Sequence, residues 1–365
     1  MRRNSANNAL KSAGGYLGPV RIGVGCARTS LLSRERIGSI VVAIVVLVWF
    51  SSDDSSTDPI PMRFAHGEAG VMTLRSAFSP DGRTIATIDT AGRVALWENE
   101  DDWRINRFLD CAGYAWSVAF SPDGRFLAVG SAEPDILVFD LRAGDAPRVL
   151  DAPTGKTKAL AFSPDGSTLA ATTAQNGEII LYDLAAGRVC ETFFGDFPAI
   201  CIAFAPDGQS LASGARDKKT VTLWDLETGR GRSLLREGIG PITSVAFSSD
   251  GSLLAAACSI DRPVRLWDVR SGRLCRQIEG HAGGTISVSF SPDGVTLTTS
   301  GNDGFVKLWS VATGDQLASL NGQSLWLPNL AFSADGRTLF ATGSDNHFRV
   351  WEMTDVFPGK PSLRD

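Results

Sequence analysis

Short runs of alternating apolar and polar residues follow one another along most of the chain. Ser117–Phe120 and Val264–Trp267 are two examples, and turn-forming residues stand between successive runs, as in Asp225–Gly229. Alternation with a period of two is typical of β-strands that bury one face. Runs spaced by roughly 8–12 residues and separated by turn residues predict antiparallel hairpins, and therefore an all-β fold.

A five-residue phrase, Phe-Ser-Pro-Asp-Gly or a close variant, recurs at steps of 42 or 43 residues. Its seven copies are Phe78–Gly82, Phe120–Gly124, Phe162–Gly166, Phe204–Gly208, Phe247–Gly251, Phe290–Gly294 and Phe332–Gly336. A later run in each repeat ends on an aromatic residue: Trp97, Phe139, Tyr182, Trp224, Trp267, Trp309 and Trp351. Four predicted strands in each unit of about 42 residues indicate a repeat architecture, in which each unit packs against its neighbours.

The two phrases together resemble the WD40 repeat family over about residues 61–365. The resemblance implies a seven-bladed β-propeller of four-stranded antiparallel blades. It also implies a structural role for four residues of the sixth repeat. His281, Thr299, Asp303 and Trp309 match the family's hydrogen-bonded tetrad, which ties one blade together.

The other repeats depart from this tetrad. Asp217, Asp261 and Asp345 stand near the family's aspartate position, but no histidine precedes them at the matching offset. Phe139 and Tyr182 replace tryptophan and lack its indole N–H donor. We therefore expect the second and third blades to depend more on apolar packing.

Closure of the ring requires a strand from outside the repeats. Counting from Phe78, the chain supplies seven sets of three strands but only six fourth strands between them. An unpaired edge would otherwise remain. We predict that residues 61–65 supply the missing strand and pair beside Phe348–Trp351.

The N-terminal part of the chain has a different composition. Residues 1–36 are basic and lack periodicity, which predicts disorder. Residues 37–52 form an apolar run that predicts a single hydrophobic helix, either a transmembrane signal-anchor or the core of a cleaved signal. Residues 53–60 read as a linker. Basic residues before the run predict a cytoplasmic N-terminus and an extracytoplasmic propeller. The alternatives are a soluble exported propeller after cleavage, or a cytosolic propeller with a mis-assigned start.

Charge and cysteine content narrow the classes of partner. Residues 1–36 carry seven arginines and lysines against one glutamate, so the rest of the chain has a net charge of −11 within a total of −5. An acidic body does not suit nucleic acid, so we predict no nucleic-acid partner. The six cysteines form no CxxC pair and stand mostly in apolar stretches. We expect buried, inert thiols, with one disulfide open if the protein is exported.

The sequence contains no recognisable catalytic constellation. It has three histidines and lacks the nucleophile-elbow, Walker and dinucleotide-binding glycine motifs. We therefore predict a non-catalytic protein without cofactor or metal. An enzyme or small-ligand binder that uses the centre of the ring remains the alternative, because propellers also host such functions.

Family members bind protein partners mainly on the face from which loops lead into the first strand of each blade, here called the front face. Residues six and four positions before the repeat phenylalanine point there. The candidates for partner binding are Met72, Leu74, Tyr114, Trp116, Lys156, Lys158 and Trp326. Exposed aromatic residues are typical of binding hot spots. The competing interpretation is that Trp116 and Trp326 pack against neighbouring blades.

Overall fold

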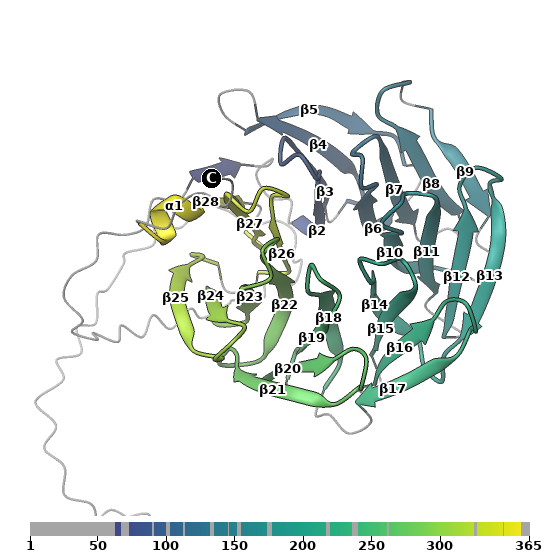
Figure 1. Cartoon of the computed structure of the whole chain (residues 1–365). Helices are drawn as coiled ribbons and strands as arrows, with labels where there is room; N and C mark the ends of the chain where they lie inside the picture. The colour runs from purple at the N-terminus through teal and green to yellow at the C-terminus, as the bar shows by residue number, and fades with distance from the viewer. Residues whose placement is uncertain are drawn as a thin grey trace, which may run out of the picture. The chain divides into compact units, whose positions relative to one another are not determined.

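The protein is described by a computed structural model that covers residues 63–66, 73–89, 91–99, 103–111, 114–131, 135–144, 146–151, 155–173, 177–216, 220–235, 240–260, 263–324, 327–345 and 347–358. These residues form seven four-stranded antiparallel sheets, which are the blades of a propeller (Figure 1). The predicted all-β seven-bladed fold is confirmed. The predicted helix at 37–52 lies outside the described residues, and none of the helices within them is long and apolar enough to cross a membrane.

Each blade runs from an innermost to an outermost strand. The first three blades contain β2 (Thr73–Phe78), β3 (Thr84–Asp89), β4 (Val94–Asn99) and β5 (Trp103–Leu109); β6 (Ala115–Phe120), β7 (Phe126–Ser131), β8 (Asp135–Asp140) and β9 (Arg148–Asp151); and β10 (Thr157–Phe162), β11 (Thr168–Thr173), β12 (Glu178–Asp183) and β13 (Arg188–Phe194).

The next three blades repeat this order. They contain β14 (Ala199–Phe204), β15 (Ser210–Ala215), β16 (Val221–Asp225) and β17 (Gly231–Leu235); β18 (Ile242–Phe247), β19 (Leu253–Cys258), β20 (Pro263–Asp268) and β21 (Leu274–Glu279); and β22 (Thr285–Phe290), β23 (Thr296–Gly301), β24 (Phe305–Ser310) and β25 (Gln316–Asn321).

The seventh blade joins the two ends of the repeat region. It contains β26 (Asn329–Phe332), β27 (Thr338–Thr342), β28 (His347–Glu352) and, as its outermost strand, β1 (Arg63–His66). β1 pairs antiparallel with β28, with Arg63 opposite Val350 and His66 opposite His347. The predicted closing pair is therefore confirmed, with the strand ending one residue later than expected. A short helix, α1 (Met353–Val356), follows β28.

The hydrophobic core lies between blades. The described residues include seven clusters of buried side chains, and each cluster is shared by two neighbouring blades. One of them joins the last blade to the first, where the Phe340 ring stacks on Phe78 and the Phe348 ring meets Trp97 edge-on, with both pairs of ring centres 4.7 Å apart. A single blade cannot bury these faces, so stability comes from stacking around the ring.

The Phe-Ser-Pro-Asp-Gly turns follow the innermost strands and form the back face. Each glycine has φ between 66° and 72°, which favours a residue without Cβ. In five turns the serine hydroxyl donates to the aspartate at 2.5–2.6 Å, and in a sixth Ser291 donates to Asp293. The same hydroxyl accepts the backbone N–H five residues later at 2.8–3.0 Å. The fourth turn has Ala205 in place of serine.

Arginines on outermost strands tie successive blades together. Arg276 of β21 donates to the Ala312 carbonyl of the next blade at 2.6 Å, and Arg232 of β17 donates to the Arg270 carbonyl at 3.2 Å. Arg107 and Arg148 make the corresponding bonds from the first and second blades. Sequence inspection does not identify these residues, because their acceptors lie about 35 residues away.

The prediction of buried thiols was only partly right. Cys111 and Cys258 are buried and Cys201 is half-buried, but Cys190 and Cys275 are exposed. The two exposed residues lie on the outermost strands β13 and β21, which have no neighbouring strand outside them. All five are free thiols, and Cys26 lies outside the described residues.

Candidate partner-binding site on the front face

A β-bulge near the start of the innermost strand shapes the front face. In six blades the pairing of the first two strands skips one residue. The skipped residues are Leu74, Trp116, Lys158, Ile200, Thr243 and Ile286. A bulged residue leaves the ladder, and its side chain is redirected. The residues four positions before the repeat phenylalanine are therefore the ones that the backbone turns out of the sheet.

Bulged residues reach toward the next blade. The ammonium of Lys158 in blade 3 lies 4.1 Å from the ring centre of Trp116 in blade 2. The Thr243 hydroxyl of blade 5 donates to the Thr285 carbonyl of blade 6 at 3.2 Å. A cation over an indole contributes about 0.5–1 kcal/mol at an exposed site. The contact holds Trp116 in a defined position while 39% of the residue stays exposed.

Tyr114 and Lys156 flank this pair. Tyr114 is the more exposed of the two aromatic residues, at 60%. Lys156 is exposed just before β10, and Lys158 is half-buried within it. Four of the seven candidates thus gather on adjacent blades 2 and 3. Trp116 contacts the next blade, as the packing interpretation expects, but it also remains accessible.

The remaining three candidates are less completely described. Met72 and Trp326 lie outside the described residues, and Leu74 is described only by its place at the bulge of β2. The full arc predicted from blade 7 to blade 3 is therefore seen only in blades 2 and 3.

Arg75 and Arg216 are cations that sequence inspection missed. Burial, followed by the charges of Lys156, Arg216 and Arg75, lowers the pKa of Lys158. Burial raises the pKa of Cys201 in blade 4 to about 12, and the positive charge of Arg75 acts in the opposite direction.

A signal for Arg75 was present in the repeat alignment. The other repeats have small or polar residues three positions before the phenylalanine: Ser117, Ala159, Cys201, Ser244, Ser287 and Asn329. Arg75 is the exception, and burial lowers its pKa. Comparing the repeats also at the position three residues before the phenylalanine would have identified Arg75.

The sixth blade contains a continuous hydrogen-bond network. His281 Nδ1 lies 2.7 Å from Asp303 Oδ1, and His281 Nε2 lies 2.8 Å from Thr299 Oγ1. The Trp309 indole donates to Thr299 Oγ1 at 2.8 Å. Because a carboxylate only accepts, the imidazole proton on Nδ1 faces Asp303, and in this tautomer Nε2 accepts from the Thr299 hydroxyl. Burial alone would raise the pKa of Asp303, but the hydrogen bond and charge of His281 outweigh it and lower that pKa.

The seventh blade replaces this histidine with an arginine. Arg349 is 1% exposed, and its guanidinium binds both carboxylate oxygens of Asp345, with Nη1–Oδ1 at 2.7 Å. It also donates to the carbonyls of His347 and Gly322. Asp303 and Asp345 occupy the same position in their repeats. The hydrogen-bond partner of Asp303, His281, lies in a loop, whereas that of Asp345, Arg349, lies in the third strand of the blade.

The aromatic residue near the end of the third strand makes different contacts in different blades. Trp97 and Trp224 donate at 2.9 Å to hydroxyls of Thr87 and Ser213, at the position that Thr299 occupies in blade 6. Phe139 is fully buried, as expected for apolar packing. The Tyr182 hydroxyl instead donates to the Asp151 carbonyl of the previous blade at 3.1 Å, and burial raises its pKa to about 12.

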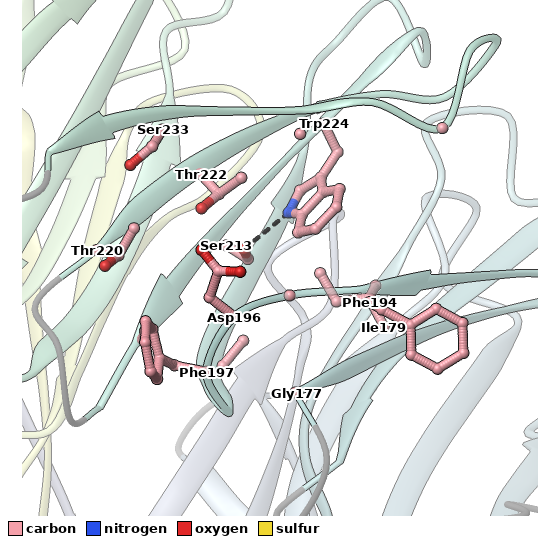
Figure 2. A pocket seen from close by; sticks show the side chains of 15 residues that line it. Gly177, Ile179, Phe194, Asp196, Phe197, Ser213, Thr220, Thr222, Trp224 and Ser233 are labelled. Atoms are coloured by element: carbon pink, nitrogen blue, oxygen red, sulfur yellow. Dashed lines mark hydrogen bonds between the residues drawn. The ribbon is translucent and has the colours of Figure 1, made fainter.

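A recess of about 270 Å³ lies between blades 3 and 4 (Figure 2). It is lined by Ser213, Trp224, Thr222 and the loop residue Asp196. Gly195, also in its wall, stands nine residues before Phe204, the offset at which blade 6 has His281. The recess therefore lies at the position where blade 4 has Gly195 and blade 6 has the His281 side chain. Among the described residues, no group of three or more histidines, cysteines or carboxylates is placed to hold a metal ion.

Comparison with known proteins agrees with this architecture. The meiotic recombination protein rec14 of Schizosaccharomyces pombe is 33% identical over 84 residues, which span 23% of this chain and 28% of that protein. The family model "WD domain, G-beta repeat" matches residues 105–140, 145–183, 187–225, 233–268, 272–310 and 314–352. Each matched unit begins near the outermost strand of one blade and ends with the third strand of the next. These matches cover more than half of the chain, and the protein belongs to the WD40 family.

Proposed function

We propose that this propeller is a non-catalytic interaction scaffold that binds a protein partner on its front face. The observation that supports the proposal is the exposure of Tyr114 and Trp116 beside one another, on a rigid ring. Large aromatic side chains contribute much of the binding energy at protein interfaces. WD40 propellers typically act as interaction scaffolds.

The proposed binding mechanism is that the propeller holds its front-face side chains in fixed positions. Trp116 is held by a bulge and by the Lys158 ammonium before any partner arrives. A side chain that is already ordered loses little conformational entropy on binding, so more of the contact energy contributes to affinity. No covalent step or cofactor is part of this mechanism.

The test compares partner capture by the full chain and by a Tyr114→Ala/Trp116→Ala variant. Proximity labelling should lose a defined set of proteins in the double variant, at nearly unchanged thermal stability. Phe108→Ala is the matched control, because Phe108 is an exposed aromatic residue on the outermost strand β5, with the Arg93 guanidinium 5.1 Å from its ring centre. Equal losses in both variants, or a large fall in melting temperature of the double variant, would reject the docking role.

We further propose that residues 37–52 tether the propeller to a membrane, with the N-terminus cytoplasmic and the propeller extracytoplasmic. The uncharged apolar run after a basic segment supports this orientation. Alkaline extraction of membranes should leave the protein in the pellet, and protease added outside should digest the propeller. Release into the soluble fraction, together with a mature N-terminus beyond residue 52, would show a cleaved signal instead.

A further inference from the structure

The recess between blades 3 and 4 belongs to the front face of the propeller. Residues 195–197 form part of its wall, and they lie in the loop that leads from β13 into β14, the first strand of blade 4. Its volume of about 270 Å³ is just below that of ordinary small-molecule pockets, about 300–1,000 Å³. The recess is therefore of a size that suits one side chain or one small ring.

The recess lies at a position where other blades carry a side chain. Four blades have a described residue nine positions before the repeat phenylalanine. In three of them this residue is Cys111, His281 or Gln323. Blade 4 has Gly195 at this position, and Gly195 lines the recess. Blade 4 thus leaves open a space that His281 fills with an imidazole ring in blade 6.

The wall of the recess combines buried and exposed polar groups. Ser213 and Trp224 are each 6% exposed, and the indole donates to Ser213 Oγ at 2.9 Å. The Trp224 ring stacks on Phe193 with ring centres 5.7 Å apart, which fixes its position. Asp196 is exposed, and Figure 2 shows its carboxylate directed toward Ser213. The Ser213 hydroxyl, which accepts the indole proton, can donate its own proton to a ligand.

An imidazole ring matches these groups. In blade 6 the Nδ1 proton of His281 faces Asp303, and Nε2 accepts from the Thr299 hydroxyl. Ser213 stands nine residues after its repeat phenylalanine, as Thr299 does, and also accepts the proton of the blade's tryptophan. Asp196 supplies a carboxylate from the neighbouring loop. The recess therefore offers an acceptor and a donor to the two nitrogens of an imidazole.

Other classes of ligand satisfy the wall less well. An ammonium group donates to Asp196 but has no acceptor for the Ser213 proton. An apolar ring would leave both groups without a bond, which is costly for a buried hydroxyl. A carboxylate would be repelled by Asp196. The wall therefore favours a ring that carries both a donor and an acceptor.

We propose that this recess binds the imidazole ring of a histidine side chain from a protein partner. The inference rests on the proposed docking function and specifies one residue of the partner. The ring donates to Asp196, accepts from Ser213 and packs against the Trp224 indole. Phe194, which lines the recess and is 70% exposed, contacts the partner's residues beside the histidine.

The probe is N-acetyl-histidine amide, added at millimolar concentrations to the full chain in a neutral detergent. The protein is labelled isotopically on tryptophan, and NMR records the indole N–H signals. The Trp224 signal, assigned with a Trp224→Phe variant, should shift on addition of the probe because the indole lines the recess. N-acetyl-phenylalanine amide should leave this signal unchanged, since its ring has neither donor nor acceptor nitrogen.

Point variants at the polar groups locate the probe. Asp196→Asn should weaken binding of the blocked histidine several-fold, because it replaces a carboxylate acceptor by an amide. Ser213→Ala should weaken binding by a similar factor. Asp315→Asn is the matched control, since Asp315 is an exposed aspartate of blade 6. Thermal unfolding of each variant shows whether it remains folded.

Filling the recess from within gives a second test. Gly195→His should abolish binding of the probe, because the chain's own imidazole then occupies the recess. A Cβ at Gly195 would lie 3.1 Å from the Gly177 carbonyl oxygen and 3.6 Å from the Trp224 ring, so the substitution requires only a small local shift. If Gly195→His does not fold, Asp196→Asn still decides the outcome.

Three results would overturn the proposal: no shift of the Trp224 signal with blocked histidine, an equal shift with blocked phenylalanine, or binding of free imidazole without binding of blocked histidine. The last result would assign the recess to a small molecule.

The histidine site and the docking surface fail in different ways. If Tyr114→Ala/Trp116→Ala loses partners in proximity labelling and Gly195→His captures them all, docking stands and the histidine site does not. If neither variant changes capture, docking on the front face is itself wrong.

Discussion

Arg349 and Asp345 form a two-point ion pair in the blade that closes the ring. The guanidinium is buried, while 34% of the carboxylate side chain is exposed. Arg349 lies in β28, the strand to which the closing strand β1 pairs, with Phe64 directly opposite it. The pair therefore supports the junction between the two ends of the repeat region.

Replacing Arg349 with Met should lower the free energy of unfolding by roughly 2–4 kcal/mol, because Asp345 loses its two bonds to the guanidinium and the Gly322 carbonyl loses a donor. Urea denaturation measures the change. Adding Asp345→Asn should recover part of the loss, since the two residues are coupled. Arg188→Ala serves as the exposed control, and a loss no larger than that of the control would contradict the role assigned to the pair.

The Thr299 hydroxyl links His281 and Trp309 in the sixth blade. Thr299→Val should destabilise the protein by roughly 2–3 kcal/mol, because it leaves a buried indole N–H and a buried imidazole nitrogen without this partner. His281→Ala should be similarly costly. The double variant should cost less than the two single changes together, because both break one network. Additive losses in thermal or chemical unfolding would show that the two residues act separately.

Ala205 gives a test of the repeated turn in the stabilising direction. Ala205→Ser should raise the free energy of unfolding by about 0.5–1 kcal/mol, since a new hydroxyl can donate to Asp207 and accept the Ser210 backbone N–H. Ser121→Ala should cause a loss of similar size in the second turn. An Ala205→Ser variant that is less stable than the parent would mean that the fourth turn has no room for the hydroxyl.

The turn aspartates should make stability depend on acid. Hydrogen bonds from Ser121, Ser163 and Ser248 lower the pKa values of Asp123, Asp165 and Asp250. A carboxylate with a lower pKa in the folded state stabilises that state above its unfolded pKa, near 4, and this contribution is lost as the pH falls through the folded pKa. Stability should therefore decline below about pH 4.

The matched comparison for this acid dependence is a Ser121→Ala/Ser163→Ala variant. Its free energy of unfolding, measured by urea titration from pH 7 to pH 2.5, should fall less steeply on acidification than that of the parent. The same slope in both proteins would show that other carboxylates control the acid limb.

Local sequence was enough to predict the blades. The alternation at Val264–Trp267 and the Pro-Asp-Gly turns define strands and their ends through contacts between near neighbours in the chain. Counting strands also placed the closing strand beside Phe348–Trp351, because an open edge is unfavourable. The exposed thiols of Cys190 and Cys275 were not predicted, since an apolar stretch does not reveal which strand of a blade is outermost.

The candidate site was predicted only in part. Tyr114, Trp116, Lys156 and Lys158 follow from their offset to the repeat phenylalanine, but their contacts do not. The Lys158–Trp116 contact depends on a bulge in each of two blades, and a pattern with a period of two carries no mark of the extra residue. Arg75 was missed because it lies three positions before the repeat phenylalanine, and only the positions six and four before it were compared.

The sequence alone determined the number of blades, the turns between their strands, the identity of the closing strand and the family, since all of these depend on periodicity and short-range conformational preference. Only the tertiary structure decided which groups meet between blades: Arg276 with the Ala312 carbonyl, Arg349 with the Gly322 carbonyl, and Lys158 with Trp116. Those contacts join separate repeats or different strands, and they form only when the ring brings their elements together.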